Sequence, residues 1–222
     1  MSEPQEQRVE GSRELERILF FSDAVFAIAI TLLVLNIQVP EIPEDLVAQE
    51  LPGQLLGLWP KYLSYVISFL LILSFWVAHH SIFSHIRSYD RSLIWLNSLF
   101  LMCIAFLPFP SALLGEYGEQ QLVVAIYAAS VAITRLMLSA VWWYAYDKPY
   151  LVRLDMDQGT ARAFHLRALY IPLIFLLSIA ISFFSVRAAI YSWVLLVVGD
   201  SVFFYLIRRR YLRRSSHREP EV

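Results

Sequence analysis

The chain has 222 residues, of which 58% are hydrophobic and only 17% charged, and its formal net charge is −1. Soluble domains are about half apolar and about a quarter charged, so this composition excludes an ordinary soluble domain and indicates a membrane protein. The net charge near zero hides a segregation, because most of the arginines lie in short polar stretches between long apolar ones, and we expect no nucleic-acid partner. Cys103 is the single cysteine, which excludes an intrachain disulfide and a cysteine-based zinc or redox site.

Six apolar stretches are long enough to cross a bilayer as helices, because about twenty apolar residues span its hydrocarbon core. They cover residues 17–37, 58–78, 93–114, 122–144, 167–186 and 188–207. The sequence therefore predicts an all-α, polytopic membrane protein with a six-helix domain at residues 13–214. Residues 1–12 and 215–222 are polar tails, expected to lack regular structure and to be cytoplasmic, and no internal repeat is evident.

Two further segments have distinctive features. Pro108 and Pro110 remove backbone donors near the end of the third stretch and predict a kink or unwinding there. Residues 145–166 form the longest loop on the side of the termini.

Basic residues are distributed unequally between the two sides of the predicted membrane domain. All of the 18 Lys and Arg residues except Lys61, Arg135 and Arg187 lie on the side that carries both termini. The positive-inside rule places that side in the cytoplasm of a cell whose plasma membrane holds the protein. The opposite loops carry acidic residues, namely Glu41, Glu44, Asp45, Glu50, Glu116 and Glu119. The arginines at 208–214 follow the last stretch and are expected to contact lipid headgroups.

The first apolar stretch contains a carboxylate, Asp23, about two turns inside its N-terminal end. An ionisable group in hydrocarbon is costly and is a functional-site hypothesis by default. At 100° per residue, Ile28, Thr31, Leu32 and Leu35 fall within about 100° of one another, whereas Asp23 lies about 140° from Ile28. If this stripe faces a pore, Asp23 faces neighbouring helices. Because the helix is apolar all round, its periodicity equally allows ordinary packing.

Polar residues in the other apolar stretches suggest structural pairing. His79 and His80 project in different directions from one helix, which favours hydrogen bonding over a shared metal ion, and we predict no metal site. Arg135 and Asp200 lie at depths that differ by only about 3 Å, which predicts a buried ion pair, with Asp23 as a competing partner. The chain lacks a T-V-G-Y-G filter, a phosphate-binding loop, H-E-x-x-H and G-x-S-x-G, so we do not expect an enzyme.

Four segments together resemble bacterial members of the transmembrane-protein-175 family of potassium channels. The resemblance covers roughly residues 13–117 and rests on Arg17-x-x-x-Phe21-Ser22-Asp23, Phe75-Trp76-x-x-His79-His80, Leu93-x-Trp95-Leu96-Asn97 and residues 106–117. It implies a potassium-permeable leak channel in a prokaryotic plasma membrane, made of four identical six-helix subunits around a central pore lined by the first helix. It implies no cofactor, with potassium ions, membrane lipids and further copies of the chain as partners.

The resemblance also implies roles for individual residues. Ile28, Leu32 and Leu35 correspond to a hydrophobic constriction, and Thr31 offers a hydroxyl group beside it. A second set is expected to hold the pore helix by hydrogen bonds and packing, and comprises Arg17, Phe21, Ser22, Asp23, Trp76, His79 and Asn97. Rings of apolar side chains can stop conduction by dewetting without a carbonyl filter.

Two other functions remain open at this stage. A proton-coupled secondary transporter could use Asp23, Asp200 and His79 as a relay, although such proteins usually show repeats and broken helices. An intramembrane metalloenzyme built on His79 and His80 would lack a third ligand of suitable spacing. A channel should give unitary currents, a transporter should show saturating flux, and a metalloenzyme should contain metal after purification.

Overall fold

The structure, a computed structural model, describes residues 3–152 and 158–193, with side chains from 14 to 152 and from 169 to 193. A short 3₁₀ helix, η1, follows the first α-helix. The elements are α1 (Glu3–Leu32), η1 (Leu33–Asn36), α2 (Val47–Gly57), α3 (Trp59–Phe83), α4 (Arg91–Phe106), α5 (Pro108–Tyr117), α6 (Gln121–Tyr146) and α7 (Gln158–Ser182). Residues 186–193 are also helical. Within the described ranges there is no strand, only an isolated bridge between Ile86 and Val152.

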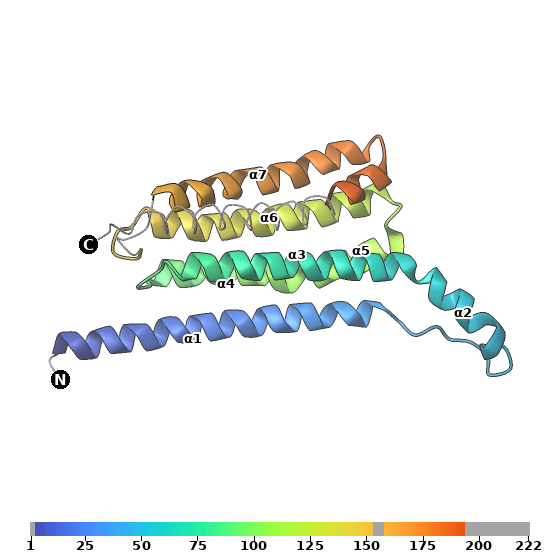
Figure 1. Cartoon of the computed structure of the whole chain (residues 1–222), viewed down its shortest axis with the longest axis horizontal. Coiled ribbons are helices and arrows are strands. Elements are labelled where there is room, and N and C mark those ends of the chain that lie inside the picture. Colours follow the sequence, from blue (N-terminus) through green and yellow to red (C-terminus); the bar gives the residue numbers. More distant parts are fainter. Residues whose placement is uncertain (1–2, 153–157, 194–222) are drawn as a thin grey trace, which may run out of the picture.

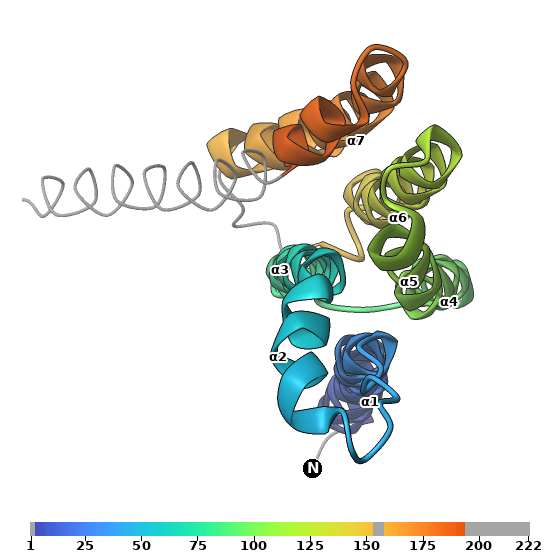
Figure 2. The same ribbon diagram turned by 90° about the vertical axis from the view of Figure 1, so that its right-hand side faces the viewer.

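The long helices lie side by side along one direction (Figure 1). Helix α1 packs against α3 and α4, α4 and α5 pack against α6, and α6 packs against α7. The end-on view places α1 at one edge of the bundle and α7 at the opposite edge (Figure 2). One side of α1 is therefore covered by its own subunit, whereas the other side is not.

Four of the described helical segments are long and apolar enough to cross a membrane. They are Glu14–Asn36, Trp59–Phe83, Arg91–Tyr117 and Gln121–Tyr146, and a shorter apolar helix covers Leu169–Ser182. These segments match the first four predicted spans and part of the fifth. Most of the sixth, residues 188–207, lies outside the described residues.

The break predicted at the prolines is confirmed. Helix α4 ends at Phe106 and α5 begins at Pro108, so Leu107 separates two helices within one predicted span. Proline is tolerated in a first turn because the amide hydrogen that it lacks would have no partner there. The first helix also changes, from α to the tighter 3₁₀ form at Leu33. Leu35 therefore lies in η1, where an α-helical wheel no longer gives its direction.

Three helical segments were not predicted from the sequence. Helix α1 begins at Glu3, so the expectation of no regular structure is wrong for residues 3–12. Helix α7 begins at Gln158, inside the predicted loop 145–166, and α2 lies in the predicted loop before Trp59. An apolar stretch predicts membrane-crossing length, whereas helical hydrogen bonds continue equally well through the polar residues that begin α1 and α7. Helix α2 has 11 residues and is too short to be identified by that length.

Two aromatic groups fill the core on either side of the bundle. Phe26, Phe75 and Phe100 are buried where α1, α3 and α4 meet. In the other half, the buried Tyr127 ring lies 4.9 Å from the Trp193 ring. The first group positions α1, which carries most of the predicted site.

Candidate functional site

Helix α1 has one face buried against its own subunit. Ser22, Phe26, Ala29 and Leu33 are all at most 1% exposed and recur every three or four residues. The Phe26 ring lies 5.7 Å from the His79 ring and 5.9 Å from that of Phe100. This packing fixes the rotation of α1 about its axis.

The opposite face of α1 carries the predicted constriction residues. Ile28, Leu32 and Leu35 are 58%, 41% and 69% exposed within the single chain. Thr31 is also exposed and donates a 2.9 Å hydrogen bond to the Ile28 carbonyl oxygen. The stripe therefore points away from the bundle, and a pore, another subunit or lipid is needed to cover it.

A chain of neutral hydrogen bonds joins α1, α3 and α4 behind that face. The Asn97 amide donates to Ser22 Oγ at 3.0 Å, and its Oδ1 lies 3.0 Å from His79 Nε2. Ser22 in turn donates to the Ile18 carbonyl oxygen at 2.8 Å. Ser22, His79 and Asn97 are all buried, so each bond replaces hydration that the side chains lose on folding.

Asp23 lies at the edge of this group and has a different partner. Trp76 Nε1 donates a 2.8 Å hydrogen bond to Asp23 Oδ1, and the Trp76 ring stacks on His80. Asp23 itself is exposed in the single chain. We call Ser22, Asp23, Trp76, His79 and Asn97 the anchor network, because their bonds connect α1 to α3 and α4.

Two further residues of the predicted set lie outside this network. Arg17 is exposed, and within the described part of the chain no hydrogen bond or ion pair joins it to Asp23. Phe21 is 61% exposed. Their roles therefore stay predictions that concern surfaces beyond one subunit.

The structure bears on part of the predicted proton relay and on one partner of the predicted Arg135–Asp200 ion pair. His79 shares a hydrogen bond with Asn97 and Asp23 accepts one from Trp76, and in the described part of the chain no hydrogen bond joins His79 to Asp23. Arg135 is buried in α6. Asp200 lies outside the described residues, so its pairing with Arg135 stays a prediction.

Sequence reasoning did not identify a second polar group, at the end of the bundle where α1 begins. Asp90 Oδ2 accepts hydrogen bonds from Tyr144 at 2.8 Å and Tyr150 at 2.9 Å, and lies 3.7 Å from Lys148 Nζ. Asp90 Oδ1 accepts from the Leu93 amide and so caps α4. We call Asp90, Tyr144, Lys148 and Tyr150 the Asp90 cluster. An aspartate directly before a helix is a recognisable cap signal, but its tyrosine partners are far away in sequence.

The Asp90 cluster sets the charge of its carboxylate. Desolvation alone would raise the pKa of Asp90, but the Leu93 amide, the two tyrosines and Lys148 together hold that pKa below its ordinary value. Arg87 and Ser88, in the segment between α3 and α4, also contact the segment after α6, because they donate hydrogen bonds to the Pro149 and Tyr150 carbonyl oxygens. The α3–α4 and α6–α7 connections are therefore joined.

Acidic and imidazole groups do not cluster elsewhere in a way that would hold a metal. Among the residues that the structure describes, no group of three or more His, Cys, Asp or Glu side chains could coordinate one. The arrangement on α1 instead consists of an apolar exposed face and a polar anchor behind it.

The chain is similar to proteins that are named as ion channels. Residues 17–108 match a family model described as the endosomal/lysosomal potassium channel TMEM175. A Streptomyces collinus protein named as a potassium channel is 38% identical over 180 residues, which cover 78% of this chain and 84% of that protein.

A solved structure and an animal protein are also similar to the chain. The crystal structure of a homologue from Chamaesiphon minutus, titled a lysosomal potassium-selective channel TMEM175 homolog, has a TM-score of 0.75 and 35% identity, and covers 86% of this chain and 97% of that chain. A Danio rerio protein named as the endosomal/lysosomal proton channel TMEM175 is 27% identical over 156 residues, which cover 70% of this chain and only 29% of that protein.

Proposed function

The chain belongs to the TMEM175 family, and we propose that it forms a potassium-permeable cation channel in a prokaryotic plasma membrane. The observation that carries this proposal is the face of α1 that bears Ile28, Leu32 and Leu35. That face is apolar and exposed, while the opposite face is fully buried in the subunit. A helix with one face packed and the other open is suited to line a space between subunits.

We propose a homotetramer of six-helix subunits. The position of α1 at the edge of the bundle supports this assembly, because four copies could bring their α1 helices around one axis (Figure 2). One subunit cannot enclose a pore with a single helix. The sixth helix of the proposal would begin with residues 186–193.

Conduction would be controlled by apolar rings. Each of Ile28, Leu32 and Leu35 would contribute four equivalent side chains to the pore, and Thr31 would add four hydroxyl oxygens next to Leu32. A narrow apolar ring expels water and blocks ions, and a modest widening admits a partly hydrated cation. This mechanism requires no carbonyl filter.

The anchor network would hold α1 at the rotation that directs this stripe to the pore. Asn97 and Trp76 contact α1 through Ser22 and Asp23, which lie about 120° and 140° around the helix from Ile28. Polar bonds between membrane helices each contribute about 0.6 kcal/mol on average, up to nearly 2. Asp23 would therefore serve packing rather than line the pore.

The charges at the two ends of the bundle support the proposed orientation. Arg87, Arg91 and Lys148 lie at the end where α1 begins, which would be cytoplasmic. The segment before α2 carries Glu41, Glu44 and Asp45, all exposed at the opposite end. If these carboxylates border the entrance, they would raise the local concentration of cations.

The decisive experiment is a bilayer recording of purified protein under potassium/sodium bi-ionic conditions, comparing the wild type with Ile28→Asn. Four amides in place of an apolar ring should favour wetting, raise the open probability and weaken discrimination between the two cations. Ile133→Asn is the matched control. It makes the same isoleucine-to-asparagine change at a position on α6 that is 52% exposed and does not belong to α1.

The control variant should conduct like the wild type. Unchanged current and selectivity in a verified Ile28→Asn assembly would exclude a constriction at this position. Saturating flux without unitary currents would instead favour a transporter.

A further inference from the structure

The turn that follows α1 arranges its four side chains in two opposite directions. Residues 33–36 form the 3₁₀ helix η1, in which side chains three positions apart lie directly above one another. Leu33 is fully buried and Asn36 is half-buried, so this pair faces the bundle. Leu32 and Leu35 are 41% and 69% exposed and form the pair on the open side. Leu35 therefore lies in line with Leu32.

The 3₁₀ form decides the direction of Leu35. Each residue turns by about 120° in a 3₁₀ helix and by about 100° in an α-helix. Three steps from Leu32 therefore return to the same direction in the first form and stop about 60° short of it in the second. The Leu32 backbone already has 3₁₀ angles, with φ −65° and ψ −24°. If η1 became α-helical, Leu35 would turn away from the line of Leu32.

Asn36 joins this turn to another part of the chain. A 3₁₀ turn is common at the end of a helix, but this one has a partner outside its own helix. Asn36 Nδ2 donates a hydrogen bond to the Pro108 carbonyl oxygen, 3.4 Å away and 72 positions further along the chain. The bond is long, so it contributes little to global stability. Its consequence is directional, because conversion of η1 to an α-helix would turn Asn36 by about 80° and break the bond.

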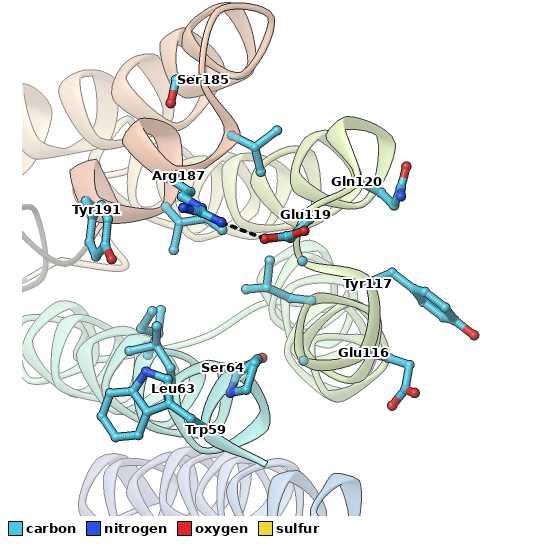
Figure 3. Close-up of a pocket in the computed structure, with 17 residues that line it drawn as sticks. Trp59, Leu63, Ser64, Glu116, Tyr117, Glu119, Gln120, Ser185, Arg187 and Tyr191 are labelled. Carbon is cyan, nitrogen blue, oxygen red and sulfur yellow. Dashed lines mark hydrogen bonds and ion pairs between the residues drawn. The ribbon is translucent and has the colours of Figure 1, made fainter. Parts of the chain in front are cut away.

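Helix α5, which begins at Pro108, is itself held by α3. The Ser64 hydroxyl donates a 2.6 Å hydrogen bond to the Ser111 carbonyl oxygen, and Figure 3 shows Ser64 between the ribbons of α3 and α5. A Cβ atom added at Gly115 would lie only 3.3 Å from the Lys61 Cα atom, so the two helices are in close contact there. These contacts help to fix the position of the carbonyl group that Asn36 binds.

We propose that Asn36 is a positioning residue for the constriction. Its bond to Pro108 holds η1 in the 3₁₀ form and so directs Leu35 along the line of Leu32, which stacks the two apolar rings in the closed pore. When this bond breaks, η1 continues the α-helix, Leu35 turns away from the axis and the ring at its level widens. The inference rests on the proposed pore and adds a residue that does not itself line it.

Cysteine labelling can measure the direction of these side chains. Leu35→Cys and Leu32→Cys are made separately in a Cys103→Ala background, which removes the single native cysteine, and each is combined with Asn36→Leu. The proteins are placed in lipid nanodiscs and treated with a cationic methanethiosulfonate reagent, and mass spectrometry follows the rate of labelling. A thiol in an aqueous pore reacts through its thiolate form, which does not develop in hydrocarbon.

The two cysteines should respond in opposite directions. Asn36→Leu should lower the labelling rate of the Leu35→Cys variant about fivefold, because the thiol turns away from the pore. It should raise the rate of the Leu32→Cys variant about fivefold, because the Leu35 ring no longer covers that position. A general loosening of the fold would raise both rates instead. Asn36→Gln keeps an amide donor and should return both rates towards their original values.

Gln38→Leu is the matched control, since Gln38 is an exposed amide two positions after Asn36, and it should leave both rates unchanged. Unchanged rates with Asn36→Leu, a rise at both positions, or the same response to Gln38→Leu would overturn the role of Asn36. Failure of the proposed pore gives a different result. Both cysteines would then stay unlabelled even with Asn36 in place, because lipid would cover the stripe, and the inference would be overturned together with the pore.

Discussion

The anchor network and the Asp90 cluster both hold α4 to neighbouring helices, but they do so in different ways. Ser22, His79 and Asn97 lie inside the membrane-crossing helices of the structure, are almost completely buried and are connected by bonds that require no charge. Asp90 and Lys148 lie at the end of the bundle, are partly exposed and combine an ion pair with hydrogen bonds from tyrosines.

The difference follows from the surroundings of each group. In hydrocarbon an unpaired charge is costly, so neutral amide, hydroxyl and imidazole groups with matched donors and acceptors are preferred. At the membrane surface, water and headgroups solvate the charges, which makes ion pairs affordable but also weak. Removing a partner should therefore cost more in the anchor network than in the Asp90 cluster.

The largest effect is expected for Asn97→Leu. This change keeps the volume but leaves the buried His79 without its amide partner, and should lower the free energy of unfolding by about 2 kcal/mol. Denaturant titration in detergent, followed by circular dichroism, measures the loss. Asn36→Leu is the matched control, because the Asn36 amide makes only a long 3.4 Å bond to the Pro108 carbonyl oxygen. Equal losses of unfolding free energy in the two variants would contradict the prediction that the anchor network stabilises the fold.

A smaller effect is expected for Asp90→Asn. Asparagine can still cap α4, so the variant removes the charge that Tyr144, Tyr150 and Lys148 contact, and we expect a loss of about 1 kcal/mol at pH 7. The lowered pKa of Asp90 means that this stability is present above about pH 4 and is lost as the pH falls through the folded-state pKa. Thermal unfolding of both proteins from pH 7 to pH 3 should show their difference shrinking at the acidic end.

Asp147→Asn provides the comparison for that experiment, because Asp147 is an exposed carboxylate close to the cluster. It should have a smaller effect at pH 7. A difference between wild type and Asp90→Asn that grows on acidification would contradict the predicted sign.

The smallest effect is expected for Tyr150→Phe. Tyr150 is 51% exposed, and Asp90 would keep the bonds from Tyr144 and the Leu93 amide when this hydroxyl is removed. The melting temperature should fall less than in Asp90→Asn, and less than in Tyr144→Phe, since Tyr144 is half-buried. If Tyr150→Phe matched Asp90→Asn, the exposed bond would be as important as the charge itself.

The sequence by itself predicted the first four membrane-crossing segments and the break near Pro108. Apolar length and missing backbone donors are local properties, so they can be identified without knowledge of the fold. The same local criteria missed α2, which is too short to cross a membrane, and the polar start of α1, where helical hydrogen bonds extend beyond the apolar stretch.

Tertiary structure decided which face of α1 is buried and which residues form the anchor network. Helix α1 is apolar all round, so its pattern could not distinguish the face of Phe26 from that of Ile28, and only contact with α3 and α4 made the difference. Ser22 and Asn97 are 75 positions apart, and Asp90 and Tyr150 are 60 apart. Such bonds depend on how the helices pack, because hydrogen bonds act over a few ångströms whatever the separation along the chain.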